Sequence, residues 1–126
     1  MPEFTWSARA MKKFPDFITN DADRVANVPD PSMAGFVFEG DDDVQIVFWQ
    51  CENGGGCEEH VHDFWEYAIV VEGHFDGTIG DEVIHMEPGD ECVIEPGVRH
   101  SGTYSKGYRA IDAFSARRVT RLSDAG

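Results

Sequence analysis

Residues 56–73 read GCEEHVHDFWEYAIVVEG and place His60 and His62 two positions apart, between a glycine run and an apolar run. Successive side chains of a β-strand point to opposite faces, so these two imidazoles would share one face of a strand. Glu66 would lie on that face too if the strand continued from His62. Imidazole and carboxylate groups are common ligands of divalent transition metals. The stretch therefore suggests a metal site, although two histidines at this spacing are more often simply exposed.

Short β-type runs surround this stretch from Ala34 onward. AGFVFE and VQIVFWQC flank residues 40–43, which is a hairpin pattern. Further runs follow, separated by turns rich in glycine and proline: EYAIVVEG, HFDGTIG, EVIHME, DECVIE, RHSGTY and YRAIDAFS. About eight strands without a long helix predict an all-β fold, an antiparallel sandwich or barrel.

Residues 1–33 lack this regularity and carry prolines at positions 2, 15, 29 and 31. Asn20 or Asp21 can cap a short helical turn between residues 19 and 27. We therefore expect an irregular N-terminal segment at residues 1–33, ahead of the β-structure.

At 126 residues the chain fits one domain, and 41% hydrophobic residues are enough to form a core. A formal net charge of −14 would repel a phosphate backbone, which argues against nucleic-acid binding. No apolar run is long enough to span a membrane, and no signal-peptide pattern opens the chain. Three cysteines are too few for a disulfide framework. We expect a cytoplasmic protein that binds a small molecule and neither nucleic acid nor membrane.

Two segments together resemble the two signature motifs of the cupin superfamily. The first motif is matched at Gly54, His60, His62, Glu66 and Gly73. The second lies in PGDECVIEPGVRH (residues 88–100) and is matched at Gly89, Gly97 and His100. This segment departs from the family pattern at Glu95, where proline is usual, and beyond it at Tyr104, where asparagine is common. These two positions shape a turn and a strand and supply no ligand.

The resemblance implies an antiparallel double-stranded β-helix, or jelly-roll, barrel over residues 34–118, followed by a C-terminal tail at 119–126. It also implies one divalent transition metal ion, without deciding among Zn, Mn, Fe, Ni, Co and Cu. The ligands would be His60, His62, Glu66 and His100, which leave two positions open on a six-coordinate ion. An open site is typical of catalysis rather than of a structural metal. The family further implies a homodimer.

The run YRAIDAFS offers a candidate for proton transfer. On a strand, Asp112 shares a face with Tyr108 and Phe114, where burial would raise the pKa of its carboxyl group. A carboxyl group of that kind can move protons in catalysis. The alternatives are that the strand is inverted or that Asp112 only pairs with an arginine.

Asp112, Phe114 and Arg118 also resemble the C-terminal motif of small cupins that linearise unsaturated uronates in pectin and alginate breakdown. The resemblance makes Asp112 and Arg118 candidate catalytic residues. Phe114 belongs to the same motif and, with Trp65, is a candidate substrate contact. One departure is Glu66, where those proteins often have glutamine.

Three functions remain open from the sequence. A Lewis-acidic metal would support isomerisation or ring opening of a sugar acid or a similar oxygen-rich substrate. The same ligands holding iron or manganese would support a dioxygenase. A cupin barrel without turnover would bind or sense a ligand, because a fold does not fix a function.

Overall fold

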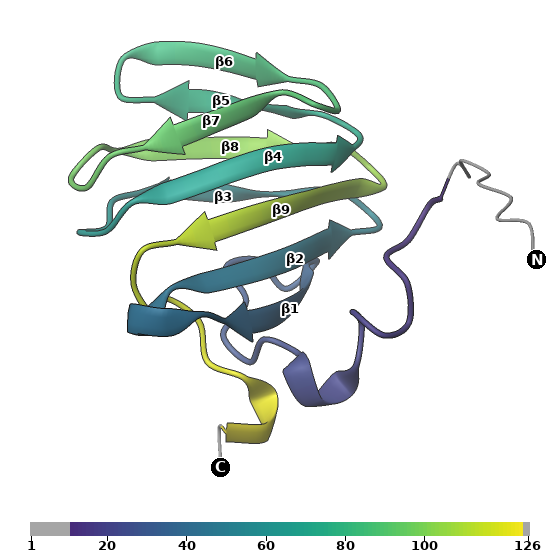
Figure 1. Ribbon diagram of the computed structural model, residues 1–126. Helices are drawn as coiled ribbons and strands as arrows, with labels where there is room; N and C mark the ends of the chain where they lie inside the picture. Colours follow the sequence, from purple (N-terminus) through teal and green to yellow (C-terminus); the bar gives the residue numbers. More distant parts are fainter. Residues whose placement is uncertain (1–10, 125–126) are drawn as a thin grey trace, which may run out of the picture.

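The computed structural model describes residues 11–124 and confirms the predicted all-β architecture. Two antiparallel sheets face each other (Figure 1). The first has the order β1-β2-β9-β4-β7, with bounds Ala34–Glu39, Gln45–Cys51, Tyr108–Phe114, Glu66–Glu72 and Glu91–Ile94. The second has the order β3-β8-β5-β6, with bounds Gly55–His60, His100–Tyr104, Phe75–Ile79 and Glu82–Met86. In the described part of the chain, no helix is long and apolar enough to cross a membrane.

The predicted hairpin is present, with β1 and β2 paired in register from Ala34 and Gln50 to Glu39 and Gln45. Its turn contains the short 3-10 helix η2 (Asp41–Asp43), in which Asp42 and Asp43 have φ values of 58° and 64°. Aspartate tolerates this left-handed region better than most residues, because its short side chain can bond locally to the backbone.

Strand β3 is not among the β-type runs predicted from the sequence, and it begins within the glycine run at residues 54–56. Because glycine has no side chain, the N-terminal segment around Asp30 and Ser32 can lie close against this strand. A Cβ atom at Gly55 would lie 2.3 Å from Asp30 Oδ2 and from Ser32 Oγ. Asp30 Oδ2 instead accepts a hydrogen bond from the Gly56 amide at 2.8 Å. The glycines therefore allow the N-terminal segment to bind to β3.

The expected continuation of one strand from His62 to Glu66 does not occur. Strand β3 ends at His60, and β4 begins at Glu66 in the other sheet. Residues 61–65 cross between the sheets, so strand parity does not place His62 and Glu66 together. The crossing itself brings the two residues to one end of the barrel.

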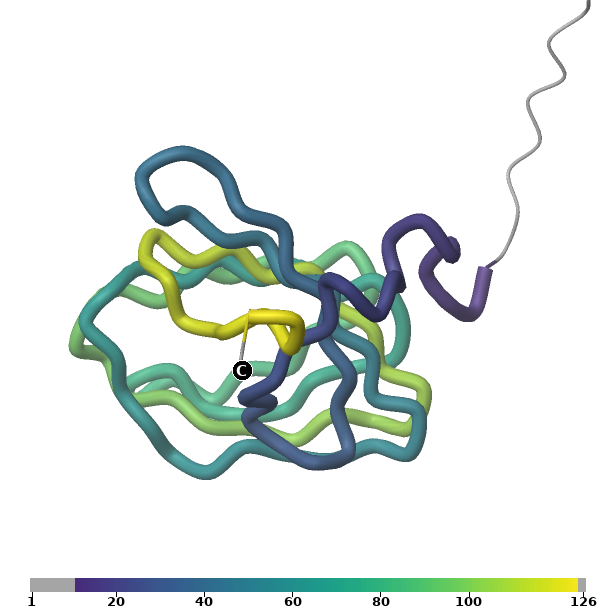
Figure 2. Tube along the Cα trace, turned by 90° about the horizontal axis from the view of Figure 1, so that it is seen from below, coloured from purple at the N-terminus to yellow at the C-terminus, as the bar shows by residue number. Residues whose placement is uncertain are grey.

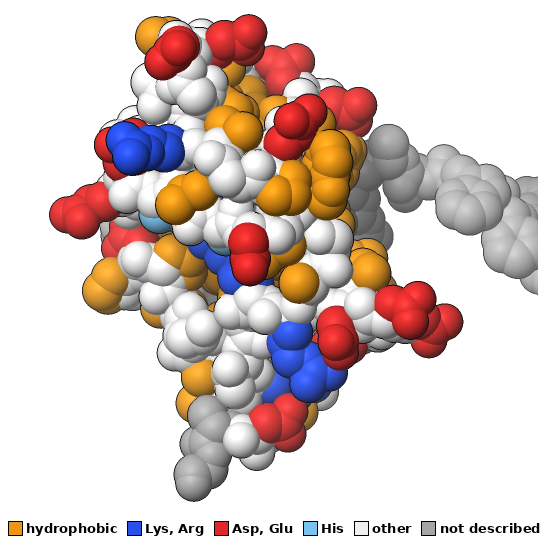
Figure 3. Space-filling view, turned by 90° about the vertical axis from the view of Figure 1, so that its left-hand side faces the viewer, with side chains coloured by type: hydrophobic (Ala, Val, Ile, Leu, Met, Phe, Trp, Pro, Cys, Tyr) orange, Lys and Arg blue, Asp and Glu red, His pale blue; other side chains and the backbone are white. Residues whose placement is uncertain are grey.

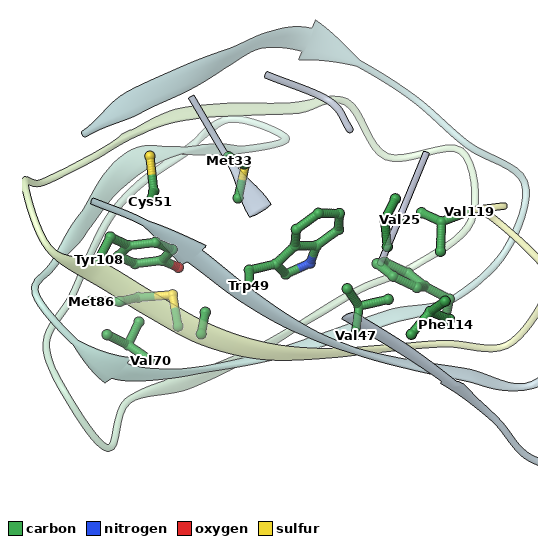
Figure 4. Close-up of a cluster of buried hydrophobic side chains, with 12 residues drawn as sticks. Val25, Met33, Val47, Trp49, Cys51, Val70, Met86, Tyr108, Phe114 and Val119 are labelled. Atoms are coloured by element: carbon green, nitrogen blue, oxygen red, sulfur yellow. The ribbon is translucent and has the colours of Figure 1, made fainter. Parts of the chain in front are cut away.

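The core lies between the sheets and follows the twofold alternation of the strands. Strand β2 buries Gln45, Val47, Trp49 and Cys51 and turns the intervening residues outward. The Trp49 ring lies between two groups of core side chains (Figure 4). It also packs against the backbone of Gly35, where a Cβ atom would lie 2.4 Å from Trp49 Cζ3. Position 35 therefore requires glycine.

Residues 20–33 and 115–124 run along the lower side of the barrel (Figure 2). The predicted helical turn is the 3-10 helix η1 (Asp21–Asp23), in which Asn20 caps the amide of Ala22. A second short 3-10 helix, η3 (Leu122–Asp124), lies near the end of the described chain. Val25 forms a β-bridge with Arg121, which joins the two segments. Val25, Met33 and Val119 are buried and complete the core from below.

The outward face of β9 is partly covered by residues near the start of the described chain. Arg109 points outward yet is buried, and its guanidinium lies 4.8 Å from the centre of the Phe14 ring. Arg109 also pairs with Glu72 and donates a hydrogen bond to the carbonyl of Met11 at 2.9 Å. Phe14 packs edge-on against Phe48. This contact explains why a charged residue can lie buried on an outer face.

Replacing Gly102 with alanine should destabilise the fold. A Cβ atom at residue 102 would lie 2.1 Å from Phe75 Cζ and 3.0 Å from the carbonyl oxygen of Asp76, so the aromatic ring would have to move. Overpacking of this kind costs about 1–3 kcal/mol, which urea unfolding would measure. Gly40→Ala is the matched control, because the nearest atom to its Cβ would lie 3.8 Å away. Equal losses in the two variants would contradict this packing.

Candidate metal centre

The predicted ligands meet at the end of the barrel where β3 ends and β4 and β8 begin, on the left in Figure 1. His60 is the last residue of β3 and lies opposite His100, the first residue of β8. Glu66 is the first residue of β4, and His62 lies in the crossing segment. The carbonyl of His62 accepts a hydrogen bond from the Gly97 amide at 2.9 Å, which ties this segment to the turn before β8.

The three imidazoles surround one small volume. Their ligand nitrogens all lie within 4.8 Å of one another, close enough for a shared metal ion. His62 Nε2 lies 2.9 Å from Glu66 Oε1, and His100 Nε2 lies 3.6 Å from the same oxygen. Nitrogen and oxygen ligands bind such ions at about 2.0–2.2 Å, so two donors on one ion lie roughly 3–4 Å apart. The separations therefore fit one ion after small side-chain shifts.

Main-chain carbonyls orient the rings. The Nδ1 atoms of His60, His62 and His100 lie 2.8, 3.3 and 3.0 Å from the carbonyl oxygens of Glu58, Phe64 and Val98. A carbonyl oxygen only accepts, so each Nδ1 is the donor and each neutral ring keeps its lone pair on Nε2. Among the described residues, the buried side-chain nitrogens and oxygens without a hydrogen-bond partner are His60 Nε2 and His100 Nε2. Orientation of this kind is typical of metal-binding histidines.

Burial and neighbouring charges act differently on the histidines. Burial lowers the pKa of His60, which keeps this imidazole neutral at neutral pH. Burial also acts to lower the pKa of His100, but the Glu66 carboxylate outweighs it and raises this pKa above its usual value. A metal ion would compete with the proton at His100, because only the neutral imidazole is a ligand.

Two carboxyl groups at the site differ in protonation. Burial acts to raise the pKa of Glu66, but interactions with His100, His62 and Asp112 hold it well below its usual value. Burial raises the pKa of Asp112 well above its usual value, and the nearby charge of Glu66 raises it further. The electrostatics of the site therefore favour the ionised form of Glu66 and the protonated form of Asp112. The predicted rise in the pKa of Asp112 is confirmed.

Arg118 reaches the site from the C-terminal segment below the barrel. Its Nη1 lies 3.6 Å from Glu66 Oε1, and its guanidinium lies 4.9 Å from the centre of the Phe114 ring. The fully buried Gln45 fixes this segment. Its Oε1 accepts hydrogen bonds from the amides of Arg118 and Val119 at 2.8 and 3.0 Å, and its Nε2 donates to the Val119 carbonyl at 2.9 Å. The cation is thus held by the fold rather than by a free tail.

A cavity of about 70 Å³ extends from the ligands into the barrel. Glu66, His60 and His100 line it on one side, together with Asp112 and Arg118. A wider surface groove adjoins it, with Pro29, Cys57, His60 and Arg118 common to both. This end of the barrel faces the viewer in Figure 3, where acidic side chains surround it. Three of the four predicted metal ligands and both candidate catalytic residues therefore share one cavity, whereas His62 is not part of its lining.

The two candidate substrate contacts lie outside the cavity lining. Phe114 is buried beneath Arg118 and packs edge-on against Phe64, whose ring stacks on His62 at 4.2 Å between centroids. Trp65 is 48% exposed. Phe114 therefore supports the site from behind, whereas Trp65 faces outward.

Gln45 and the cavity residues Cys57, Tyr104 and Tyr108 are not among the sequence candidates for the site. The sequence does mark Gln45 as unusual, because it is a polar residue at an inward-facing position of β2, where the other inward-facing residues are apolar. Two others also have a signal, because Tyr108 shares a strand face with Asp112 and Cys57 lies three residues before His60. Tyr104 reaches the cavity through strand pairing, which only the folded molecule shows.

Comparison with known proteins agrees with this geometry. Residues 47–106 match the family model described as a cupin domain. No curated protein matches the chain. KdgF from a Halomonas species is a similar solved structure, with 24% identity over 70% of this chain and 83% of that chain and a TM-score of 0.64.

Two further solved structures are similar. An RmlC-like cupin from Shewanella frigidimarina shares 21% identity over 77% of this chain and 86% of that chain, with a TM-score of 0.67. The oxalate decarboxylase of Bacillus subtilis, a protein with Mn(II) centres, shares 18% identity over 72% of this chain and 28% of that chain, with a TM-score of 0.60. At these identities the likenesses establish the fold alone, and they confirm the expected jelly roll.

Proposed function

We propose that this chain, whose residues 47–106 match the cupin domain model, binds one divalent transition metal ion and uses it for proton-transfer chemistry on a small acid. The ligands are His60, His62, Glu66 and His100. One observation carries the proposal: two buried Nε2 atoms without partners face the same cavity as an ionised Glu66. Buried polar groups without partners are rare and call for a ligand. A metal ion satisfies both nitrogens and the carboxylate together.

When bound, the metal would supply a Lewis acid that polarises an oxygen atom of the substrate. Arg118 would bind the carboxylate of the substrate, because it is the cation that lines the cavity. Asp112 could give the proton of its carboxyl group to one substrate atom, and the resulting carboxylate could then take up the proton that another substrate atom releases. Such a transfer conserves atoms and electrons, as isomerisation and ring opening require.

The uronate motif and the similarity in fold to KdgF support a sugar acid as one substrate for this chemistry. Two other functions of the same site have distinct signatures. A dioxygenase would consume oxygen, and a sensing module would bind its ligand without changing it.

The test is reconstitution of metal-free protein with single metal ions in deuterated buffer. Candidate acids, namely unsaturated uronates and short oxo acids, are followed by NMR. We expect deuterium exchange or isomerisation that requires added metal. Oxygen uptake would favour the dioxygenase, and ligand binding without exchange would favour the sensing module; either would overturn the proposal.

A further inference from the structure

The cavity beyond the metal ligands is largely apolar. Five apolar side chains line it from strands β4 to β7 of the two sheets, namely Ala68, Phe75, Ile79, Met86 and Ile94. Residues of β3, β8 and β9, among them Cys57, Tyr104 and Tyr108, complete the lining. A substrate that extends past the ligands would therefore place its far end against carbon and sulfur atoms. Such walls favour an apolar group, at about 25 cal/mol per Å² of apolar surface removed from water.

The polar groups of the lining beyond the predicted ligands are few. The hydroxyl of Ser101 already lies 3.1 Å from that of Thr78. The other hydroxyl groups of the lining residues belong to Tyr104 and Tyr108. A polyhydroxylated molecule would lose more bonds to water there than these groups could replace, which is costly.

Charge favours an anion at the mouth of the cavity. Arg118 lines both the cavity and the adjoining groove, with its Nη1 3.6 Å from Glu66 Oε1. A substrate carboxylate would match the guanidinium geometry of Arg118 and offset part of the charge of a bound divalent ion.

The size of the cavity limits the rest of the substrate. Its volume of about 70 Å³ would hold on the order of five water-sized groups. Five such groups correspond to a short aliphatic tail, and a six-carbon sugar acid has more than twice as many non-hydrogen atoms. The four ligands leave two positions on a six-coordinate ion, which a carboxylate oxygen and a neighbouring oxygen could fill together.

We propose that the substrate is a short-chain aliphatic 2-oxo or 2-hydroxy acid, with its carboxylate at Arg118 and the metal and its tail in the cavity. This inference rests on the proposed metal site and narrows its substrate. The aliphatic tail would occupy the space between Ala68 on one sheet and Phe75 on the other. A sugar acid is the alternative that the test must reject.

The test is calorimetric titration of the metal-loaded full chain with glyoxylate, pyruvate, 2-oxobutyrate, 2-oxovalerate and galacturonate. Each added methylene should tighten binding about three- to fourfold until the cavity is full. Galacturonate should bind at least about tenfold more weakly than 2-oxovalerate. No trend with chain length, tighter binding of galacturonate, or no binding by any acid would overturn the inference.

Ala68→Leu fills the cavity and should weaken 2-oxovalerate binding at least about tenfold, while glyoxylate binding changes less than about twofold. Ala34→Leu, in β1 outside the cavity lining, is the matched control and should change neither. Equal effects of Ala68→Leu on both acids would contradict the inference. If Ala68→Leu fails to fold, the series of acids of increasing chain length still tests the inference on the unaltered protein. Metal content is measured on every sample, so failure of the metal site is distinguished from failure of the substrate assignment.

Discussion

Replacing His100 with alanine is expected to abolish stable metal binding. His100 supplies one of the two buried Nε2 atoms without a partner, and it lies opposite His60 in the β3–β8 pair. Its loss leaves an ion with two imidazoles and one carboxylate from the protein. Loss of a supporting hydrogen bond alone costs about 10- to 100-fold in affinity, so loss of a ligand should cost at least about 100-fold.

Competition with a chromophoric chelator measures this change in affinity. His85→Ala is the matched control, because His85 is exposed on β6 and bonds to Asp76 and Glu87, away from the site. It should keep the affinity of the unaltered protein. Retention of that affinity by His100→Ala, in a protein with an unchanged circular dichroism spectrum, would contradict the assigned ligand set.

Replacing Asp112 with asparagine is expected to lower metal-dependent turnover by about 10²- to 10⁴-fold, the usual contribution of a positioned acid or base. Asparagine has nearly the same shape as aspartic acid, but it cannot release a proton. Metal content should therefore stay near that of the unaltered protein. The rate of deuterium exchange into substrate is the appropriate readout, because it reports the proton step itself.

The same substitution should stabilise the metal-free protein at neutral pH. The folded state raises the pKa of Asp112, so folding takes up a proton and stability falls as pH rises above the unfolded pKa. Asparagine does not titrate, so the variant avoids this loss of stability. Its midpoint temperature of thermal unfolding should therefore be higher than that of the unaltered protein. Asp76→Asn, an exposed carboxylate on β5, is the control for turnover. Unchanged exchange in Asp112→Asn would remove Asp112 from the mechanism.

Local patterns in the sequence predict much of this fold. Alternation of apolar residues marks the inward face of β2 and places Asp112 and Phe114 on the inward face of β9. The turn between β1 and β2 also follows from its own residues. Strand β3 is different, because GGCEEH has neither apolar alternation nor strong β propensity. It is held by pairing with β8 and by the carboxylate of Asp30, which are contacts between distant parts of the chain.

The candidate site, like the fold, can be predicted from the sequence only in part. The spacing of the two motifs is enough to predict the four ligands. Their side chains come together because the chain crosses from one sheet to the other, and not because they share one continuous strand. The neighbours of Asp112 follow from strand pairing: it lies opposite Ala68 in β4, next to the position of Glu66. Gln45 acts on Arg118 across 73 positions of sequence. No local pattern encodes such a distance, so the cavity and its apolar walls emerge only from the assembled barrel.

The metal content of protein purified without a metal-affinity step tests the central claim most directly. Elemental analysis should find close to one first-row transition metal ion per chain. Removal by chelation and return of one metal should restore the same ratio, and His62→Ala should prevent it. A folded protein that contains no such metal and takes up none on addition would contradict the account.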